Sequence, residues 1–115
     1  RIMTNEKLLE KFFQSENDRD WATFRGCLHP DVMWFLHTET EHTLVAGREE
    51  YMDRVLTGYQ GTTAQKAGFT CESMLVSNSG NRIVAKIKNS LGGYSIDIFD
   101  FEDGVIRWEY EYLLD

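Results

Sequence analysis

The sequence predicts an α+β domain in which helices cover one face of an antiparallel sheet. Helical periodicity is confined to the first half of the chain, up to residue 56. From Phe69 onward the chain shows the alternation of β-strands, and clusters of Gly, Asn, Asp and Ser separate the alternating runs. Helices gathered first and hairpins gathered last are typical of α+β domains.

The composition is that of one folded domain, which we expect to span residues 1–115. Hydrophobic residues make up 42% of the chain, enough for a core. The net charge of −7 argues against a nucleic acid or an anionic membrane as partner, because both require clustered Lys and Arg. No apolar run is long enough for a membrane span or a signal peptide. Cys27 and Cys71 lack metal-ligand spacing, so we expect reduced thiols in a cytoplasmic protein with neither metal nor cofactor.

Three helices are expected in the first half. Asn5 and Asp20 are candidate N-caps of the first two, because short polar side chains accept hydrogen bonds from the first free amides of a helix. Pro30 ends the second helix, and the third covers residues 47–56. Their apolar residues recur at helical spacing: Leu8, Leu9, Phe12, Phe13, Trp21, Phe24, Leu28, Tyr51, Met52, Val55 and Leu56.

A first strand is expected over residues 31–36, where the run is nearly all apolar and so buried on both faces. Residues 37–44 and 58–68 are expected to be loops. Strands over residues 69–76 and 82–89 follow, and a long hairpin closes the chain from Tyr94 to Leu114, with its turn at Asp103-Gly104.

Asp97 is the unusual residue of this hairpin, because it shares a strand face with Phe99 and Phe101. Such a carboxylate is either an edge charge or a group inside an apolar cavity. The residues opposite it depend on the turn. A two-residue turn pairs Asp97 with Tyr110 and turns Ile106, Trp108, Tyr110 and Tyr112 towards the Asp97 face. A three-residue turn with a bulge pairs Asp97 with Glu109 and turns Arg107, Glu109 and Glu111 that way. A shift of one residue exchanges the two faces, so both registers stay open.

The order of these motifs resembles the nuclear transport factor 2-like superfamily, and within it the SnoaL-like and ketosteroid isomerase-like group. The resemblance covers almost the whole chain. It rests on the opening helix and on the segments Asn17–Trp21, Leu28–Trp34, Gly47–Glu49, Phe101–Ile106 and Glu111-Tyr112. It implies a cone-shaped, strongly curved sheet with three helices around a deep pocket, and a dimer in many members.

The resemblance also implies roles for single residues. The protonated aspartate of ketosteroid isomerase falls on Asp97. Its tyrosine falls on Phe12, which has no hydroxyl, and its base falls near Leu36, which cannot accept a proton. Glu111 beside Tyr112 resembles the last-strand carboxylate of limonene epoxide hydrolase. The isomerase reaction as that enzyme performs it therefore lacks two of its groups here.

We expect a pocket for a small, largely apolar molecule. The candidate catalytic residues are Asp97, Glu111 and His37, the last because histidine titrates near neutral pH. The candidate ligand-binding residues are Phe12, Trp34, Leu36, Phe99, Phe101, Trp108 and Tyr110. Trp34 has two interpretations, a core residue or a ligand contact. The first functional hypothesis is an isomerase or hydrolase, and the alternative is a non-catalytic ligand-binding or dimerisation module. Apolar residues on the sheet face away from the helices, such as Tyr94, Ile96 and Ile98, predict a homodimer through the sheet.

Overall fold

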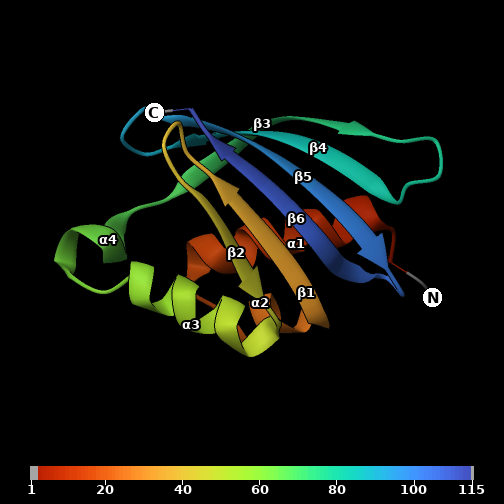
Figure 1. Cartoon of the computed structure of the whole chain (residues 1–115), viewed down its shortest axis with the longest axis horizontal. Coiled ribbons are helices and arrows are strands. Elements are labelled where there is room, and N and C mark those ends of the chain that lie inside the picture. Colours follow the sequence, from red (N-terminus) through yellow and green to blue (C-terminus); the bar gives the residue numbers. More distant parts are fainter. Residues whose placement is uncertain (1–2, 115) are drawn as a thin grey trace.

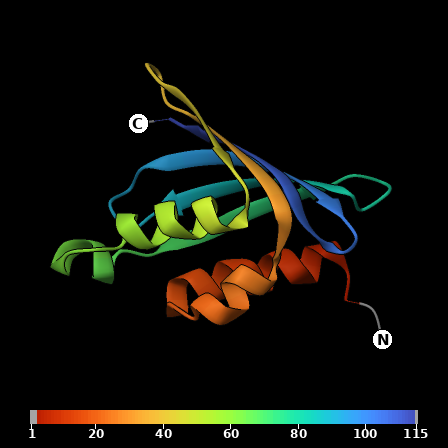
Figure 2. The same cartoon turned by 60° about the horizontal axis from the view of Figure 1, so that its bottom comes forward.

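The computed structural model describes residues 3–114. Six strands form one curved, open sheet in the order β2-β1-β6-β5-β4-β3. The elements, in chain order, are α1 (Asn5–Asp18), α2 (Trp21–Gly26), β1 (Leu28–His37), β2 (His42–Ala46), α3 (Arg48–Gly58), α4 (Thr62–Lys66), β3 (Phe69–Val76), β4 (Arg82–Asn89), β5 (Tyr94–Glu102) and β6 (Val105–Leu113). The helices α1, α2 and α3 lie on the same side of the sheet (Figures 1 and 2).

The α+β class and the curved sheet are confirmed, with one difference in the strand directions. The strands β1 and β6 pair in parallel, whereas the other neighbours pair antiparallel. Parallel strands need a long connection, and here the elements from β2 to β5 lie between β1 and β6 along the chain. None of the described helices is long and apolar enough to cross a membrane.

The first helix is capped by Thr4 and not by Asn5 as expected. The Thr4 side chain accepts a hydrogen bond from the Lys7 amide at 3.1 Å. The Asn5 side chain instead donates to the Gly80 carbonyl at 2.9 Å, which ties α1 to the turn between β3 and β4. The N-cap of α2 is Asp20, as predicted, with its carboxylate accepting from the Thr23 amide.

The segment from residue 37 to residue 44 is a hairpin and not a loop. The first strand runs on to His37, and its partner strand begins at His42. The polar residues of this hairpin misled the sequence prediction because β2 is an edge strand, and its side chains are mostly exposed or half-buried. Pro30 lies inside β1 at an irregular stretch of the pairing with β6, where its missing amide proton is tolerated. Residues 62–66, expected in a loop, form the short helix α4.

The closing hairpin follows neither predicted register along its whole length. Phe101 pairs with Ile106, as a two-residue turn requires, but an irregularity follows and Asp100 pairs with Trp108. Arg107 is therefore an extra residue on β6, a β-bulge. Beyond it Asp97 pairs with Glu111, and Phe99 pairs with Glu109. The bulge thus turns Glu109 and Glu111 to the side of the helices.

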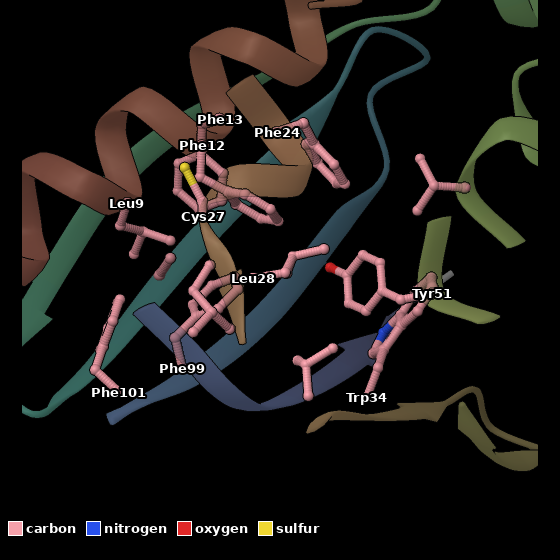
Figure 3. Close-up of a cluster of buried hydrophobic side chains, with 14 of the residues drawn as sticks. Leu9, Phe12, Phe13, Phe24, Cys27, Leu28, Trp34, Tyr51, Phe99 and Phe101 are labelled. Carbon is pink, nitrogen blue, oxygen red and sulfur yellow. The ribbon is translucent and has the colours of Figure 1, made fainter. Parts of the chain in front are cut away.

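The core lies between the sheet and the helices α1, α2 and α3. Phe12 stacks on Phe24 with ring centroids 4.3 Å apart, and Phe99 meets Phe12 edge-on (Figure 3). Each of these buried aromatic rings contributes about 2–3 kcal/mol of hydrophobic stabilisation. This packing holds α1 against β5, and Phe12 and Phe99 also form part of the wall of a cavity.

Candidate functional site

A cavity of about 370 Å³ lies between the sheet and the helices α1 and α3. Its walls include the aromatic residues Phe12, Phe13, Trp34, Tyr51, Tyr59, Phe69, Tyr94 and Phe99. Four carboxyl groups also line it, those of Glu16, Asp97, Glu109 and Glu111, whereas Arg54 is the single basic residue among the described lining residues. An apolar cavity with a few convergent polar groups is the usual form of a small-molecule site.

Three of the carboxyl groups form a cluster, which we call the acid cluster: Asp97, Glu109 and Glu111. Asp97 comes from β5 and the two glutamates from β6, and all three face the helices because Asp97 pairs with Glu111 and Phe99 with Glu109. One oxygen from each lies within 4.8 Å of the others. Asp97 is 7% exposed and Glu109 is 4% exposed. Three carboxyl groups this close and this buried cannot all be ionised together.

Two aromatic residues donate hydrogen bonds to the acid cluster. The Trp34 indole N–H donates to Glu111 Oε1 at 3.0 Å, and the Tyr51 hydroxyl donates to Glu109 Oε1. Their rings lie side by side, with centroids 4.7 Å apart (Figure 3). Asp97 interacts with the Ser95 side chain, but its buried Oδ1 has no hydrogen-bond partner among the described residues. Asp97 therefore has a buried carboxyl oxygen whose capacity for hydrogen bonding is unused.

Burial raises the pKa of all three acids. For Asp97 the cause is burial and then the neighbouring Glu111, which together hold its pKa well above the usual range. Burial and the charges of Glu111 and Asp97 do the same for the pKa of Glu109. Burial and the nearby Glu16 raise the pKa of Glu111 to about 7, although the Trp34 hydrogen bond and Arg54 oppose the rise. The raised pKa values favour the protonated forms of Asp97 and Glu109, whereas Glu111 titrates near neutral pH.

A second acid–tyrosine pair lies on the wall of the cavity. The Tyr59 hydroxyl donates to Glu16 Oε2 at 2.5 Å, and the guanidinium of Arg19 lies 4.1 Å from the centre of the Tyr59 ring. Burial raises the pKa of Glu16, against the effects of the Tyr59 hydrogen bond and the Arg19 charge. Glu16 adds negative potential to the cavity but has its own donor and its own counter-charge.

Five of the residues predicted for the site line the cavity. They are Asp97, Glu111, Phe12, Trp34 and Phe99. Phe101 is part of the buried core and Leu36 packs at its margin, and neither is among the lining residues.

Three other predicted site residues, Trp108, Tyr110 and His37, do not line the cavity, so the prediction is wrong for them. The bulge at Arg107 turns Trp108 and Tyr110 to the opposite face of the sheet, where Tyr110 stacks on Phe35 at 5.0 Å. His37 lies at the edge hairpin, with its Nδ1 2.6 Å from His42 Nδ1 and its ring stacked on Tyr112. It is not among the residues that line the cavity.

Sequence reasoning missed Glu16, Tyr51, Tyr59 and Glu109 as site residues. Tyr51 was expected to point inward, and Glu16 follows Phe12 by one helical turn, so helical spacing contained a signal for both. Glu109 appeared on the cavity side in only one of the two open registers. Within residues 3–114, two groups of acids could hold a metal ion: the acid cluster, and His29 with Glu102 and Asp103. The oxygen ligands of the acid cluster suit a hard cation such as Mg²⁺ or Ca²⁺.

Comparison with solved structures shows which fold this is. A protein from Kribbella flavida DSM 17836 with the provisional name ketosteroid isomerase matches with a TM-score of 0.81 at 19% identity, over 96% of this chain and 78% of that one. A nuclear transport factor 2-like protein of unknown function from Cytophaga hutchinsonii ATCC 33406 matches with a TM-score of 0.76 at 15% identity, over 98% and 91%. An LEH-like epoxide hydrolase of M. tuberculosis matches with a TM-score of 0.73 at 14% identity, over 95% and 81%.

The chain therefore has the nuclear transport factor 2-like fold, as its motifs predicted. No protein-family model matches the sequence, and no curated protein matches it either. Since proteins of this fold differ in what they do, the function has to be argued from the cavity.

Proposed function

We propose that the protein is an enzyme that performs acid–base chemistry on a small, largely apolar molecule held in the cavity. Glu111 is the base that accepts and returns a proton, and Asp97 is the neutral acid that donates a hydrogen bond to the substrate. The observation that carries the proposal is the pairing of these two carboxyl groups across β5 and β6, inside an aromatic-walled cavity of about 370 Å³. An acid and a base side by side in a dry site are what a proton-transfer reaction needs.

The two carboxyl groups have matched tasks in this proposal. Glu111, with a pKa of about 7, accepts a proton from a carbon next to a carbonyl group and returns it to another carbon of the same molecule. Asp97 stays neutral and donates a hydrogen bond to the oxygen on which negative charge develops. The net reaction is an isomerisation, since no atom of the substrate is lost. The aromatic walls contact the apolar part of the substrate.

Two neighbours of this fold support enzymatic activity and differ in reaction type. One has the provisional name ketosteroid isomerase, and another is an epoxide hydrolase. We favour isomerisation because Asp97, which lines the cavity, has a carboxyl oxygen without a hydrogen-bond partner, and because no basic side chain forms an ion pair with Asp97 or Glu111 among the described residues. The base is then Glu111, since Phe12 and Leu36 occupy the positions where ketosteroid isomerase has a tyrosine and a base.

The test uses a small β,γ-unsaturated ketone, 3-cyclohexen-1-one, whose conversion to the conjugated isomer is followed by ultraviolet absorbance. The Asp97→Asn and Glu111→Gln variants should each lose at least about 100-fold in rate. His37→Gln is the matched control and should keep full activity, because His37 lies outside the cavity. Conversion of 1,2-epoxycyclohexane in ¹⁸O-labelled water to an ¹⁸O-labelled 1,2-diol would instead identify a hydrolase. Tight binding of both compounds without turnover would identify a binding module.

We also propose that two copies associate through the outer face of the sheet. Phe35, Ile96, Ile98, Trp108 and Tyr110 are partly exposed on that face. A continuous apolar patch of this kind is unusual on a monomer.

The free thiols Cys27 and Cys71 agree with a reducing, cytoplasmic setting.

The dimer is tested by analytical ultracentrifugation at micromolar concentration. We expect twice the chain mass of 13.4 kDa for the native protein and the single mass for Ile98→Asp. Leu91→Asp is the control, because Leu91 is 88% exposed in the turn between β4 and β5 and should leave the mass unchanged. A native protein that sediments as a monomer would contradict this proposal.

A further inference from the structure

The cavity contains a surplus of acidic groups that basic side chains do not balance. Four carboxyl groups line it, whereas the single basic residue among the described lining residues is Arg54, which is exposed on α3. Glu16 has a counter-charge in Arg19. The three members of the acid cluster form no ion pair among the described residues. Because a buried acidic group is stabilised by a positive partner, the cavity favours a ligand that supplies one.

The acid cluster also has unused capacity to accept hydrogen bonds. Asp97 lines the cavity and is 7% exposed, and its Oδ1 has no hydrogen-bond partner among the described residues. One oxygen from each of the three acids lies within 4.8 Å of the others. A nitrogen placed between three such oxygens lies within about 2.8 Å of each, the usual length of a charge-assisted hydrogen bond. A primary ammonium group has three N–H donors, one for each carboxyl group.

The surroundings of the cluster suit an organic cation better than a metal ion. Trp34 and Tyr51 already donate to one oxygen of Glu111 and one of Glu109, and their rings lie side by side (Figure 3). Aromatic rings attract ammonium groups. Mg²⁺ and Ca²⁺ need about six or more oxygen ligands, which a wall of aromatic rings does not supply. A cavity of about 370 Å³ also has room for an apolar body attached to the ammonium group.

We propose that the acid cluster binds the ammonium group of a small amine whose apolar body packs against the aromatic walls of the cavity. This inference goes beyond the proposed isomerisation and does not rest on it. The ammonium group donates to oxygens of Asp97, Glu109 and Glu111, and both ionised and protonated carboxyl groups can accept such a bond. An amine held there occupies Asp97 and Glu111, so it excludes the ketone and inhibits its conversion competitively.

The test compares ligands that share a six-membered ring and differ in charge: cyclohexylamine, cyclohexanol and cyclohexanecarboxylate. Their binding to the native protein is measured by NMR titration of its amide signals at pH 7.5, where an alkylamine is protonated. Cyclohexylamine should bind at least about 10-fold more tightly than cyclohexanol, because charge-assisted hydrogen bonds are the stronger ones. Cyclohexanecarboxylate should bind most weakly, because it meets groups of its own charge. No turnover is needed, so failure to find a substrate leaves the result unaffected.

Asp97→Asn and Asp100→Asn provide a matched pair of variants on β5. Asp97→Asn should weaken the binding of cyclohexylamine at least about 10-fold and that of cyclohexanol much less, because only the amine gains from the acidic group. Asp100→Asn removes the same charge on the other face of the sheet, where Asp100 pairs with Arg82, and should leave the binding of both ligands unchanged.

Two results with the native protein would overturn the inference, whether or not the variants fold. One is cyclohexanol binding as tightly as cyclohexylamine. The other is displacement of cyclohexylamine by millimolar Mg²⁺ or Ca²⁺, which would identify the cluster as a metal site. Unchanged amine binding in a folded Asp97→Asn variant would also overturn it. So would an equal loss in Asp100→Asn, because the overall negative charge of the protein would then be what attracts the amine.

Discussion

At the scale of single residues, Asp97 shows how its surroundings determine the chemistry of a carboxyl group. Asp100, three residues later on β5, faces the other side of the sheet. It forms a bidentate ion pair with Arg82, in which Arg82 Nε lies 2.6 Å from Asp100 Oδ1. Asp97 faces the cavity, where it has Ser95 and two other acids as neighbours. The same side chain is thus an ion-pair partner on one face and a candidate hydrogen-bond donor on the other.

The first prediction concerns the stability of Asp97→Asn. The pKa of Asp97 is raised in the folded state, so above the unfolded value of about 4 the folded state must either keep the proton or bury a charge. This opposes folding increasingly as pH rises, and asparagine removes the effect. At pH 7.5 the variant should be more stable than the native protein. Its advantage in free energy of unfolding should be larger there than at pH 5, by on the order of 1 kcal/mol. Thermal unfolding of both proteins at both pH values measures this.

Asp100→Asn is the matched control for this experiment. It loses a bidentate ion pair with Arg82, in which the Arg82 side chain is 60% exposed and that of Asp100 is 16% exposed, so we expect a destabilisation of about 1 kcal/mol. If Asp97→Asn is destabilised at pH 7.5 more than at pH 5, Asp97 is an ionised structural carboxylate and not a cavity acid.

At the scale of secondary-structure elements, the turn between β5 and β6 determines where the acids of β6 can point. Asp103 and Gly104 have φ angles of 55° and 76°, the two positive values of a tight type I′ hairpin turn. The turn then leads into the bulge at Arg107, and together they set Glu109 and Glu111 opposite Phe99 and Asp97. A glycine in this turn is therefore a requirement of the site as well as of the fold.

We predict that Gly104→Ala destabilises the protein by about 1 kcal/mol, because alanine pays a steric penalty at positive φ. Gly26→Ala is the control: Gly26 ends α2 without a positive φ, and an added Cβ would meet no atom within 4 Å. It should be neutral or slightly stabilising. Urea unfolding of the three proteins gives the comparison, and equal effects at the two positions would contradict the assigned turn.

The Arg19 side chain, at the end of α1, binds the connection between α3 and β3. The Arg19 guanidinium donates to the carbonyls of Ala64, Gln65 and Ala67, which belong to α4 and the residue after it. It also stacks on Tyr59, which lines the cavity. Arg19 therefore connects the wall of the cavity to the end of the first helix.

We expect Arg19→Met to loosen this connection more than it destabilises the whole protein. Amide hydrogen exchange over residues 64–68 should become at least about 10-fold faster, since several charge-assisted hydrogen bonds are lost. Exchange in β5 should change little. Arg25→Met is the control, because Arg25 forms an exposed ion pair with Glu49 and should leave residues 64–68 unaffected. Unchanged exchange in Arg19→Met would show that α4 is held by other contacts.

At the scale of the whole molecule, the cavity concentrates acids whose pKa values are all raised: Glu16, Asp97, Glu109 and Glu111. Each binds its proton more tightly when folded, so its stabilising effect is complete only below its unfolded pKa and is lost as pH rises towards its folded pKa. For Glu111 the stabilisation is lost between its ordinary pKa of 4.5 and its pKa of about 7 in the folded protein. The protein should therefore be more stable near pH 5 than near pH 8.

This prediction is checked by the melting temperature from pH 5 to pH 8 at constant, high ionic strength, which screens the net charge of −7. We expect the melting temperature to fall by several degrees as pH rises. The fall should be clearly smaller in the double variant Asp97→Asn/Glu111→Gln. A melting temperature that rises over this range, in either protein, would mean that the acids are stabilised as carboxylates in the folded state.

Local patterns in the sequence were enough to determine the α+β class and most of the elements. The Phe12 and Phe13 stripe placed α1, Asp20 capped α2, and Asp103-Gly104 joined the last two strands, because each signal depends on neighbours within a few residues. The alternation that sets Asp97 on one strand face with Phe99 and Phe101 is equally local, and together with the family resemblance it made Asp97 a candidate for the site.

Only the tertiary structure decided what surrounds Asp97. The bulge at Arg107 comes from the path of β6 between β5 and β1, and it exchanged the predicted faces of Trp108 and Tyr110 with those of Glu109 and Glu111. Tyr51 and Trp34 reach the two glutamates from α3 and β1, which are far from them along the chain. A shift of one residue in the pairing leaves the alternation along each strand unchanged but turns every side chain to the other face. The register was therefore selected by contacts between segments that are distant in the sequence.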